Sequence, residues 1–250
     1  MLQTINWFKP ISLLGFLALA ACAAAPTASG INDPHESVNR SFHSFNVGLD
    51  RALIRPASSA YGAILPPPIE AGISNFANNL DAPGQVLNHL LQGKPQFAAQ
   101  NTLRFALNTT AGIGGLFDFS TAIGLPGVDT DFGETLHVWG VGEGAYVELP
   151  GFGPSTERDA VGLVVDIVTN PVNAVIPELS GTVSTAAQIG SKLSDRDRFS
   201  NTVDSILYDS ADGYAQLRLL YLQKRRFELG QTDAESDATF VDPYEDPYAQ

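Results

Sequence analysis

The chain's only cysteine is the residue whose chemistry the sequence specifies most clearly. Cys22 follows an uninterrupted run of 11 apolar or small residues, Ile11 to Ala21, and Lys9 is the only charged side chain before that run. Such a run is about half of the roughly 20 residues that span a bilayer, but it fits a signal-peptide core of about 7–15. The pattern predicts a lipobox, with cleavage before Cys22 and a diacylglyceryl group attached through its sulfur. The alternative is an ordinary alanine-rich signal peptide with a chance cysteine.

Other residue patterns that could support catalysis or metal binding are incomplete. No Gly-x-Ser-x-Gly elbow occurs, Gly93-Lys94-Pro95 lacks the Ser or Thr of a phosphate-binding loop, and the zinc motif His-Glu-x-x-His fails because His35-Glu36 is followed by Asn39. Asp129 and Asp131 could serve a hydrolase or bind calcium, but paired acids before a helix more often cap it. We therefore predict no catalytic residue, no metal site and no cofactor.

Composition narrows the class of protein further. The 250 residues are 44% hydrophobic, and 14 Lys and Arg stand against 27 Asp and Glu, which gives a net charge of −13. This balance repels nucleic acid. Only 16% of residues are charged, against about 25% in an ordinary soluble domain. The surface therefore lacks the usual dense coat of charges.

The chain divides into four predicted segments. Residues 1–21 form a lipoprotein signal peptide, 22–31 a short tether mainly of Ala, Pro, Thr, Ser and Gly, and 32–230 a helical domain. Residues 231–250 contain six acids and no base, which predicts a disordered acidic tail. An interaction segment is the alternative for the tail.

Apolar residues within the domain recur at helical spacing. Asp33 with Pro34 and Glu36 predicts the capped start of a long amphipathic helix that ends before Pro56. Its apolar stripe is Val38, Phe42, Phe45, Leu49 and Leu53. Further helices are expected from Pro66-Pro68, from Pro83 to Gly93, over 95–108, from a Ser155 or Thr156 cap to Asn170-Pro171, and over about 180–193 and 211–229. The best strand is 145–149, so the class is mainly α.

Charge is sparse over two long stretches of this domain. Phe105 to Val128 contains only Asp118, and Ala160 to Ser194 contains three charged residues. Helices with so few charges have no obvious face for water. Together with recurrent Gly and Pro, this predicts a single domain of short and amphipathic helices that is partly embedded in lipid.

Read in order, the motifs of the domain resemble the MlaA (VacJ) family of outer-membrane phospholipid-trafficking lipoproteins. The densest match runs from Trp139 to Asp159. The matching residues are Asp33-Pro34, Asn39-Arg40, Phe45-Asn46, Ser74-Asn75-Phe76, Asn79-Leu80, Leu91-Gln92-Gly93, Arg104-Phe105, Gly114-Gly115-Leu116-Phe117-Asp118, Asp131-Phe132-Gly133, Trp139-Gly140-Val141-Gly142-Glu143-Gly144, Leu149-Pro150, Gly153-Pro154-Ser155 and Arg158-Asp159. Val38, Glu134 and His137 depart from the usual pattern.

The resemblance implies a ring-like helical protein in the inner leaflet of the outer membrane of a Gram-negative bacterium, enclosing an amphipathic channel. Phospholipids misplaced in the outer leaflet would pass through it to a periplasmic carrier of the Mla type. That carrier would deliver them to an inner-membrane ABC transporter complex. A trimeric porin is the expected partner in the outer membrane, and no cofactor is expected.

Two groups of residues are candidates for the channel. Asn46, Asn75, Asn79 and Asn108 lie on otherwise apolar segments and are candidate lining residues, and Gly140, Gly142 and Gly144 form a candidate gate or hinge. Capping and turn formation are the alternatives for the asparagines, and a rigid turn is the alternative for the glycines. A non-transporting envelope scaffold is the second functional hypothesis.

Overall fold

The computed structural model describes residues 31–172 and 180–231. The predicted signal peptide, Cys22, nearly all of the tether and the acidic tail after Gln231 lie outside these residues. None of the helices that are described is long and apolar enough to cross a membrane.

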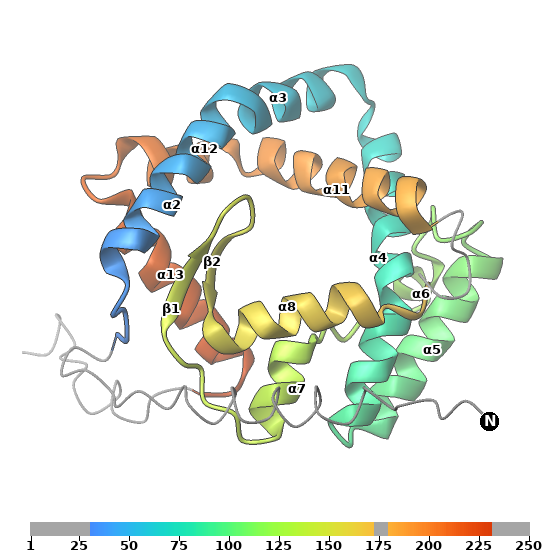
Figure 1. Cartoon of the computed structure of the whole chain (residues 1–250). Helices are drawn as coiled ribbons and strands as arrows, with labels where there is room; N and C mark the ends of the chain where they lie inside the picture. The colour runs from blue at the N-terminus through green and yellow to red at the C-terminus, as the bar shows by residue number, and fades with distance from the viewer. Residues whose placement is uncertain (1–30, 173–179, 232–250) are drawn as a thin grey trace, which may run out of the picture.

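The elements follow one another around a ring (Figure 1). The first arc consists of α2 (Glu36–Leu49), the π-helical turn η1 (Asp50–Ile54) and α3 (Arg55–Ile64), and α4 (Pro67–Leu91) forms the next side. Outside α4 lie α5 (Pro95–Thr110) and the short α6 (Phe119–Ala122). The ring continues through α7 (Phe132–Val138), the hairpin of β1 (Tyr146–Leu149) and β2 (Gly153–Thr156), and α8 (Glu157–Thr169).

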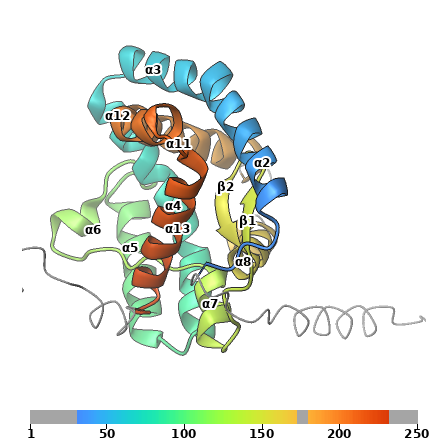
Figure 2. The ribbon, with the colours of Figure 1, turned by 90° about the vertical axis from the view of Figure 1, so that its left-hand side faces the viewer.

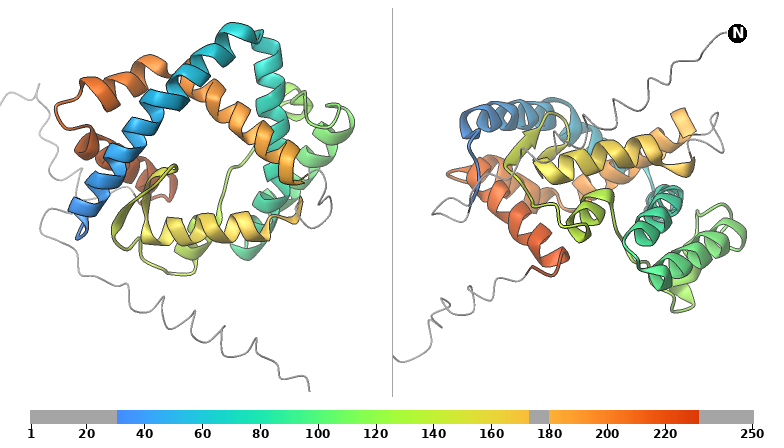
Figure 3. Two further views of the ribbon diagram at one scale, coloured as in Figure 1. Left: turned by 45° about the horizontal axis from the view of Figure 1, so that its top comes forward. Right: turned by 60° about the horizontal axis from the view of Figure 1, so that its bottom comes forward.

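The C-terminal elements complete the ring from behind α2 and the hairpin. They are the π-turn η2 (Ser180–Ser184), α11 (Thr185–Arg198), α12 (Ser200–Asp204), the π-turn η3 (Ser205–Asp209) and α13 (Gly213–Glu228). Viewed from the side, α2, the hairpin and α8 lie at one edge of the molecule and α6 lies at the other (Figure 2). The ring outline persists when the molecule is tilted (Figure 3).

This architecture confirms the mainly α class and several predicted boundaries. α5 begins at Pro95, and α8 begins after Thr156, whose Oγ1 accepts a hydrogen bond from Asp159 N. Proline suits the first turn of α5 because its missing N–H has no helical partner there. β1 lies at the predicted strand and pairs antiparallel with β2, which was not predicted, from Tyr146 opposite Thr156 to Leu149 opposite Gly153.

Three expectations about prolines and caps are wrong. The helix does not end before Pro56, because η1 leads into α3 and places Pro56 in its first turn. No separate helix starts at Pro83, which lies inside α4. A proline interrupts one helical hydrogen bond, but α4 packs along both α5 and α11, and this packing keeps it continuous. Asp33 does not cap α2, which begins after His35 without a side-chain cap.

Asp33 instead belongs to the contacts that join α2 to α13. Its carboxylate accepts hydrogen bonds from Asn39 Nδ2, the Tyr214 hydroxyl and Arg218. Nearby, Arg40 donates to both oxygens of Asp212 at 3.0 and 2.8 Å. The first and last helices of the described chain are thus joined by ionic contacts.

The Arg40–Asp212 contact predicts an acid-sensitive contribution to stability. The hydrogen bond from Arg40, followed by that from Ala215 N, lowers the pKa of Asp212 to about 2. A lowered pKa in the fold means stability that is complete above the unfolded value of about 3.8 and is lost as pH falls toward 2. We expect Asp212→Asn to lower the thermal midpoint at pH 7 by clearly more than at pH 2, where about half of Asp212 is already protonated in the fold; circular dichroism in detergent measures both. An equal effect at both pH values would contradict this.

Burial in the ring is inverted relative to a water-soluble domain. Among the described residues, 18 polar or charged residues are buried against 11 hydrophobic ones, while 27 large hydrophobic side chains are exposed. Helix α2 illustrates the inversion: it buries Asn39 and His43 but exposes Val38, Phe42 and Phe45 by 51%, 39% and 56%. Soluble monomers rarely expose large apolar patches. The predicted apolar stripe of α2 is therefore real, but much of it is exposed rather than packed against a protein core.

Candidate functional site

A polar cavity of about 290 Å³ lies between α4, α5 and the segment that contains α6. Because α5 and α6 lie outside α4 in Figure 1, the cavity is beside the ring wall rather than at its centre. Its lining is rich in amides and contains one arginine and two carboxylates. The polar residues that line it are Asn75, Asn78, Asn79, Gln85, Asn101, Arg104, Asn108, Asp118, Thr121 and Asp129.

Three of the four asparagines predicted to line a channel meet in this cavity. Asn75 Nδ2 donates to Leu116 O at 3.3 Å, and Asn79 Nδ2 donates to Thr109 Oγ1 at 3.0 Å. Asn108 donates to Asp118 Oδ1 at 3.1 Å and accepts from Ser120 N at 2.9 Å. These amides position the loop after α5 as well as lining the cavity. Their role in a channel stays a prediction.

The fourth asparagine, Asn46, lies elsewhere and holds the β-hairpin. Its Nδ2 donates to Leu149 O at 3.0 Å and to Glu148 Oε1 at 3.1 Å, and its Oδ1 accepts from Gly151 N at 2.7 Å. All of its amide atoms are therefore engaged at the turn. This placement matches the turn-forming alternative for Asn46.

The sequence analysis did not predict that Asn78, Gln85, Asn101 and Arg104 line a cavity, although a signal was present. Asn101, Arg104 and Asn108 stand at positions i, i+3 and i+7 of α5, and Asn75 and Asn79 stand four apart on α4. Residues at these spacings share one face of a helix. Two polar faces on consecutive helices would predict a polar seam between them, which is where the cavity lies.

Charged groups in the cavity are paired mainly with each other. Arg104 Nη2 lies 3.1 Å from Asp118 Oδ1. Burial raises the pKa of Asp118, but hydrogen bonds from Thr121, Asn108 and Arg104 outweigh it and hold the pKa below its usual value. Asp129 Oδ1 accepts from Gln85 Nε2 at 3.2 Å. With one cation and two carboxylates, the cavity carries net negative charge.

The three candidate gate glycines lie in the loop between α7 and β1 and differ from one another. Gly140 and Gly144 have φ values of +87° and +74°, whereas Gly142 has no left-handed conformation. A Cβ on Gly144 would lie 2.6 Å from Glu157 Oε2, but a Cβ on Gly140 or Gly142 would meet nothing within 4 Å. The loop is therefore packed tightly at Gly144 and has space at Gly142.

Glu143, between two of these glycines, is fixed to the last helix. Arg226 of α13 donates to Glu143 Oε1 at 2.6 Å and to Oε2 at 3.2 Å. The Glu143 carbonyl also accepts from Arg158 N at 3.3 Å. If the loop moved as a gate, the contacts of Glu143 with Arg226 and Arg158 would have to break, or these residues would have to move with the loop. The gate itself stays a prediction.

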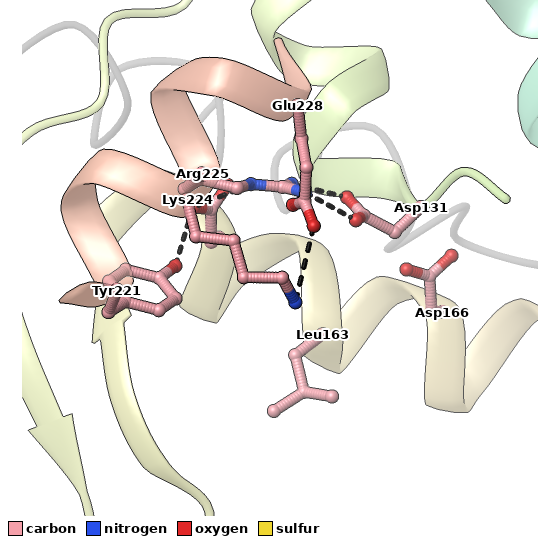
Figure 4. Close-up of a pocket in the computed structure, with 8 residues that line it drawn as sticks. Asp131, Leu163, Asp166, Tyr221, Lys224, Arg225 and Glu228 are labelled. Atoms are coloured by element: carbon pink, nitrogen blue, oxygen red, sulfur yellow. Dashed lines mark hydrogen bonds and ion pairs between the residues drawn. The ribbon is translucent and has the colours of Figure 1, made fainter. Parts of the chain in front are cut away.

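A second cavity, of about 240 Å³, lies where α13 meets α7 and α8. Figure 4 shows Arg225 directed at Asp131, to which its Nη1 and Nη2 donate at 2.8 and 2.7 Å. Arg225 Nη2 also donates to Asp159 Oδ1 at 3.1 Å, and the Tyr221 hydroxyl donates to Asp159 Oδ2 at 2.7 Å. Arg225 thus cross-links α13 to the starts of α7 and α8.

The acids at this second cavity have structural partners. Asp131 Oδ1 accepts from Glu134 N at 2.8 Å and caps α7, which confirms the capping interpretation for this residue. Burial raises the pKa of Asp159, but Arg225 and then Arg158 outweigh it, so the pKa is lowered overall. Within the described residues, no group of three or more His, Cys, Asp or Glu side chains is placed to hold a metal ion.

Comparison with known proteins gives a consistent result. The family model described as MlaA lipoprotein matches residues 31–228. A Shigella flexneri protein named "Intermembrane phospholipid transport system lipoprotein MlaA" is 33% identical over 242 residues, covering 95% of this chain and 92% of that relative. The Escherichia coli K12 protein of the same name is 33% identical over 249 residues, with the same two coverages.

A solved structure agrees with the sequence relatives. It is described as "Structural basis for maintenance of bacterial outer membrane lipid asymmetry" and matches with a TM-score of 0.68 and 33% identity. The match covers 79% of this chain and 98% of that one. The chain belongs to the MlaA lipoprotein family.

Proposed function

We propose that the protein is an outer-membrane lipoprotein that maintains lipid asymmetry by removing phospholipids misplaced in the outer leaflet. They pass through an amphipathic channel to a periplasmic carrier of the Mla type for retrograde transport to the inner membrane. The observation that carries this proposal is the inverted burial of the ring: among the described residues, polar side chains outnumber hydrophobic ones in the buried set, and 27 large hydrophobic side chains are exposed. Such an exposed apolar surface suits contact with lipid.

The proposal places the ring in the periplasmic leaflet of the outer membrane. Cleavage of residues 1–21 leaves Cys22 as the lipid-bearing residue and 22–31 as the tether, with 231–250 as an acidic tail. Two or three acyl chains give a stable anchor, because each buried CH₂ contributes about 0.8 kcal/mol. The anchor and the apolar exterior would act together to hold the ring at the membrane.

The partners in this proposal are phospholipid, a trimeric porin, the periplasmic carrier and, through it, an inner-membrane ABC transporter complex. The names of the relatives support the first of these directly, since they describe intermembrane phospholipid transport. The proposed activity is transport, with no bond made or broken and no cofactor. Passive passage through a channel follows the lipid gradient, so the direction of transport must be set by partners.

The test is the amount of phospholipid in the outer leaflet of cells with and without the gene, measured as access of an added phospholipase to intact cells. We expect surface phospholipid to rise on deletion and to return with the wild-type chain. Complementation with the Cys22→Ala variant should lower surface phospholipid much less than complementation with the wild-type chain. Unchanged surface phospholipid, in a strain with no second copy, would favour the non-transporting scaffold.

The glycine loop offers a sharper test of the channel gate. Gly142→Ala should leave the thermal midpoint unchanged, because its Cβ would meet nothing within 4 Å. Gly144→Ala should lower stability by about 1–3 kcal/mol, because it combines a φ of +74° with a clash against Glu157. Circular dichroism in detergent measures both.

The matched pair separates a gate from a rigid turn. If the loop gates the channel, Gly142→Ala will change surface phospholipid in cells at wild-type protein levels. If Gly142→Ala behaves as wild type in both assays, while Gly144→Ala reduces folded protein, the loop is a turn required for packing.

A further inference from the structure

The cavity between α4 and α5 contains hydrogen-bond acceptors that the protein's own donors do not fully use. Asn79 is 6% exposed, and its Oδ1 is buried without a hydrogen-bond partner. Asp129 uses Oδ1 for Gln85, which leaves Oδ2 as a further acceptor at the mouth. A buried acceptor without a partner is unfavourable, so the cavity favours a ligand that donates hydrogen bonds.

The one cation that lines the cavity, Arg104, already donates hydrogen bonds to protein groups. Arg104 donates through Nη2 to both oxygens of Asp118 at 3.1 and 3.2 Å. Its Nη1 donates to Thr121 Oγ1 at 3.1 Å and to the Leu125 carbonyl. Of the two carboxylates that line the cavity, Asp118 is paired with Arg104, whereas Asp129 has no cation partner among the lining residues. The charge and the free acceptors both favour a positively charged donor over an anion.

Exposed apolar side chains stand next to two of the cavity's lining residues along the chain. Phe117 and Phe119 flank Asp118, Ile123 follows Thr121 by two positions, and the three are exposed by 63%, 39% and 56%. The only acid or base from Phe105 to Val128 is Asp118. A ligand that fills the polar cavity and also covers these side chains must therefore have a polar head and apolar chains.

From these observations we infer that the cavity binds the headgroup of a phospholipid that carries a primary ammonium, whose N–H groups donate to Asn79 Oδ1 and Asp129. Its acyl chains lie along Phe117, Phe119 and Ile123. The volume of about 290 Å³ is near the lower end of the range for small-molecule sites, about 300–1,000 Å³. The inference rests on the proposed transport function and deepens it by naming a lipid class.

The test measures which lipids the full-length lipoprotein retains after equilibration in detergent micelles that contain equal phosphatidylethanolamine, phosphatidylcholine and phosphatidylglycerol. Retained lipid is extracted and quantified by mass spectrometry. We expect phosphatidylethanolamine to be enriched about fivefold over the other two, because choline has no N–H donor and glycerol has no positive charge. Retention of the three in equal amounts would overturn the inference.

Variants test whether the enrichment comes from this cavity. Asp129→Asn should reduce it to about twofold or less, because the exposed carboxylate changes charge with little change of shape. Asp195→Asn makes the same change at an exposed position on α11 and should leave the enrichment intact. An Asp129→Asn protein that retains the wild-type enrichment would overturn the assignment to this cavity.

Two further outcomes distinguish a lipid from a soluble amine as the ligand, and the headgroup preference from the transport function. Soluble phosphoethanolamine should not displace the bound lipid, since it lacks the chains that cover Phe117 and Ile123. Displacement at lipid-like concentration would make the ligand a soluble amine and overturn the lipid assignment. Retention of no phospholipid of any class would count against the transport function itself, whereas equal retention of all three removes only the headgroup preference.

Discussion

Arg225→Met should lower the stability of the ring by about 3–5 kcal/mol, because the buried Asp159 carboxylate loses one of its two cations and Asp131 loses its contact with the same arginine. The Asp159 side chain is 9% exposed and that of Arg225 is 13% exposed. Besides Asp159, Arg225 holds Asp131, the cap of α7. One substitution therefore removes the ionic contacts by which α13 is joined to the starts of α7 and α8.

The measurement is the thermal midpoint of the detergent-solubilised lipoprotein, followed by circular dichroism. For a domain of about this size, such a loss corresponds to a fall of roughly 6–20 °C. Lys224→Met is the matched control: it removes a neighbouring cation whose side chain is 78% exposed, and it should change stability by about 0.5 kcal/mol or less. A midpoint for Arg225→Met within 2 °C of the control, a margin of roughly 1 kcal/mol, would show that the network does not stabilise the ring.

A second substitution separates the charge from the packing. In Arg225→Met with Asp159→Asn, the buried carboxylate is neutral, so part of the lost stability should return. Tyr221 and Arg158 also contact Asp159, which is why recovery should be incomplete. A double variant less stable than either single one would mean that the charge of Asp159 is not the source of the loss.

Local signals in the sequence predicted local structure well. Pro95 and Thr156 predicted the starts of α5 and α8, because first-turn proline and a side-chain cap act over a few residues. Pro56 and Pro83 predicted boundaries that do not exist, since a π-turn accommodates the first and packing of α4 between α5 and α11 accommodates the second. Tertiary contacts override such signals, and a single sequence does not contain them explicitly.

The candidate site was predicted only in part, for a related reason. Three of the four asparagines predicted to line a channel meet in one cavity, but residue type alone did not distinguish Asn46 from them. Its contacts with the hairpin cross more than 100 positions of the chain. The pairing of Arg225 with Asp131 likewise spans 94 positions. Contacts of this range follow from the closed ring, not from any local pattern.

The spacing of apolar residues in α2 predicted an apolar face, but it did not predict whether that face is buried or exposed. Spacing of three and four residues identifies an apolar face whether that face meets a protein core or a membrane. The sparse charge of the whole chain was the signal that distinguished the two, and the structure places the polar face of α2 inside. This arrangement makes α2 a suitable helix on which to test the proposal that the exposed apolar surface meets lipid.

Replacing the exposed face of α2 with serine, as Val38→Ser, Phe42→Ser and Phe45→Ser together, should leave the ring folded and weaken its hold on the membrane. Each side chain returned to water from hydrocarbon loses about 1.5–3 kcal/mol of transfer free energy, whereas exposed positions contribute little to folding. In a Cys22→Ala background, the triple variant should shift from the membrane pellet toward the detergent-free supernatant. The unsubstituted Cys22→Ala chain should remain in the pellet.

The opposite face of the same helix supplies the control, because its polarity is reversed. Asn39 is 3% exposed, donates to Asp33 Oδ1 and Tyr146 O, and accepts from Glu148 N. Asn39→Leu makes the helix more hydrophobic, yet it should destabilise the ring by about 2–4 kcal/mol, because buried polar partners lose their bonds. In a water-soluble helix, the apolar face would be the sensitive one. A triple serine variant that unfolds, beside an Asn39→Leu variant that does not, would show that α2 packs its apolar face against protein.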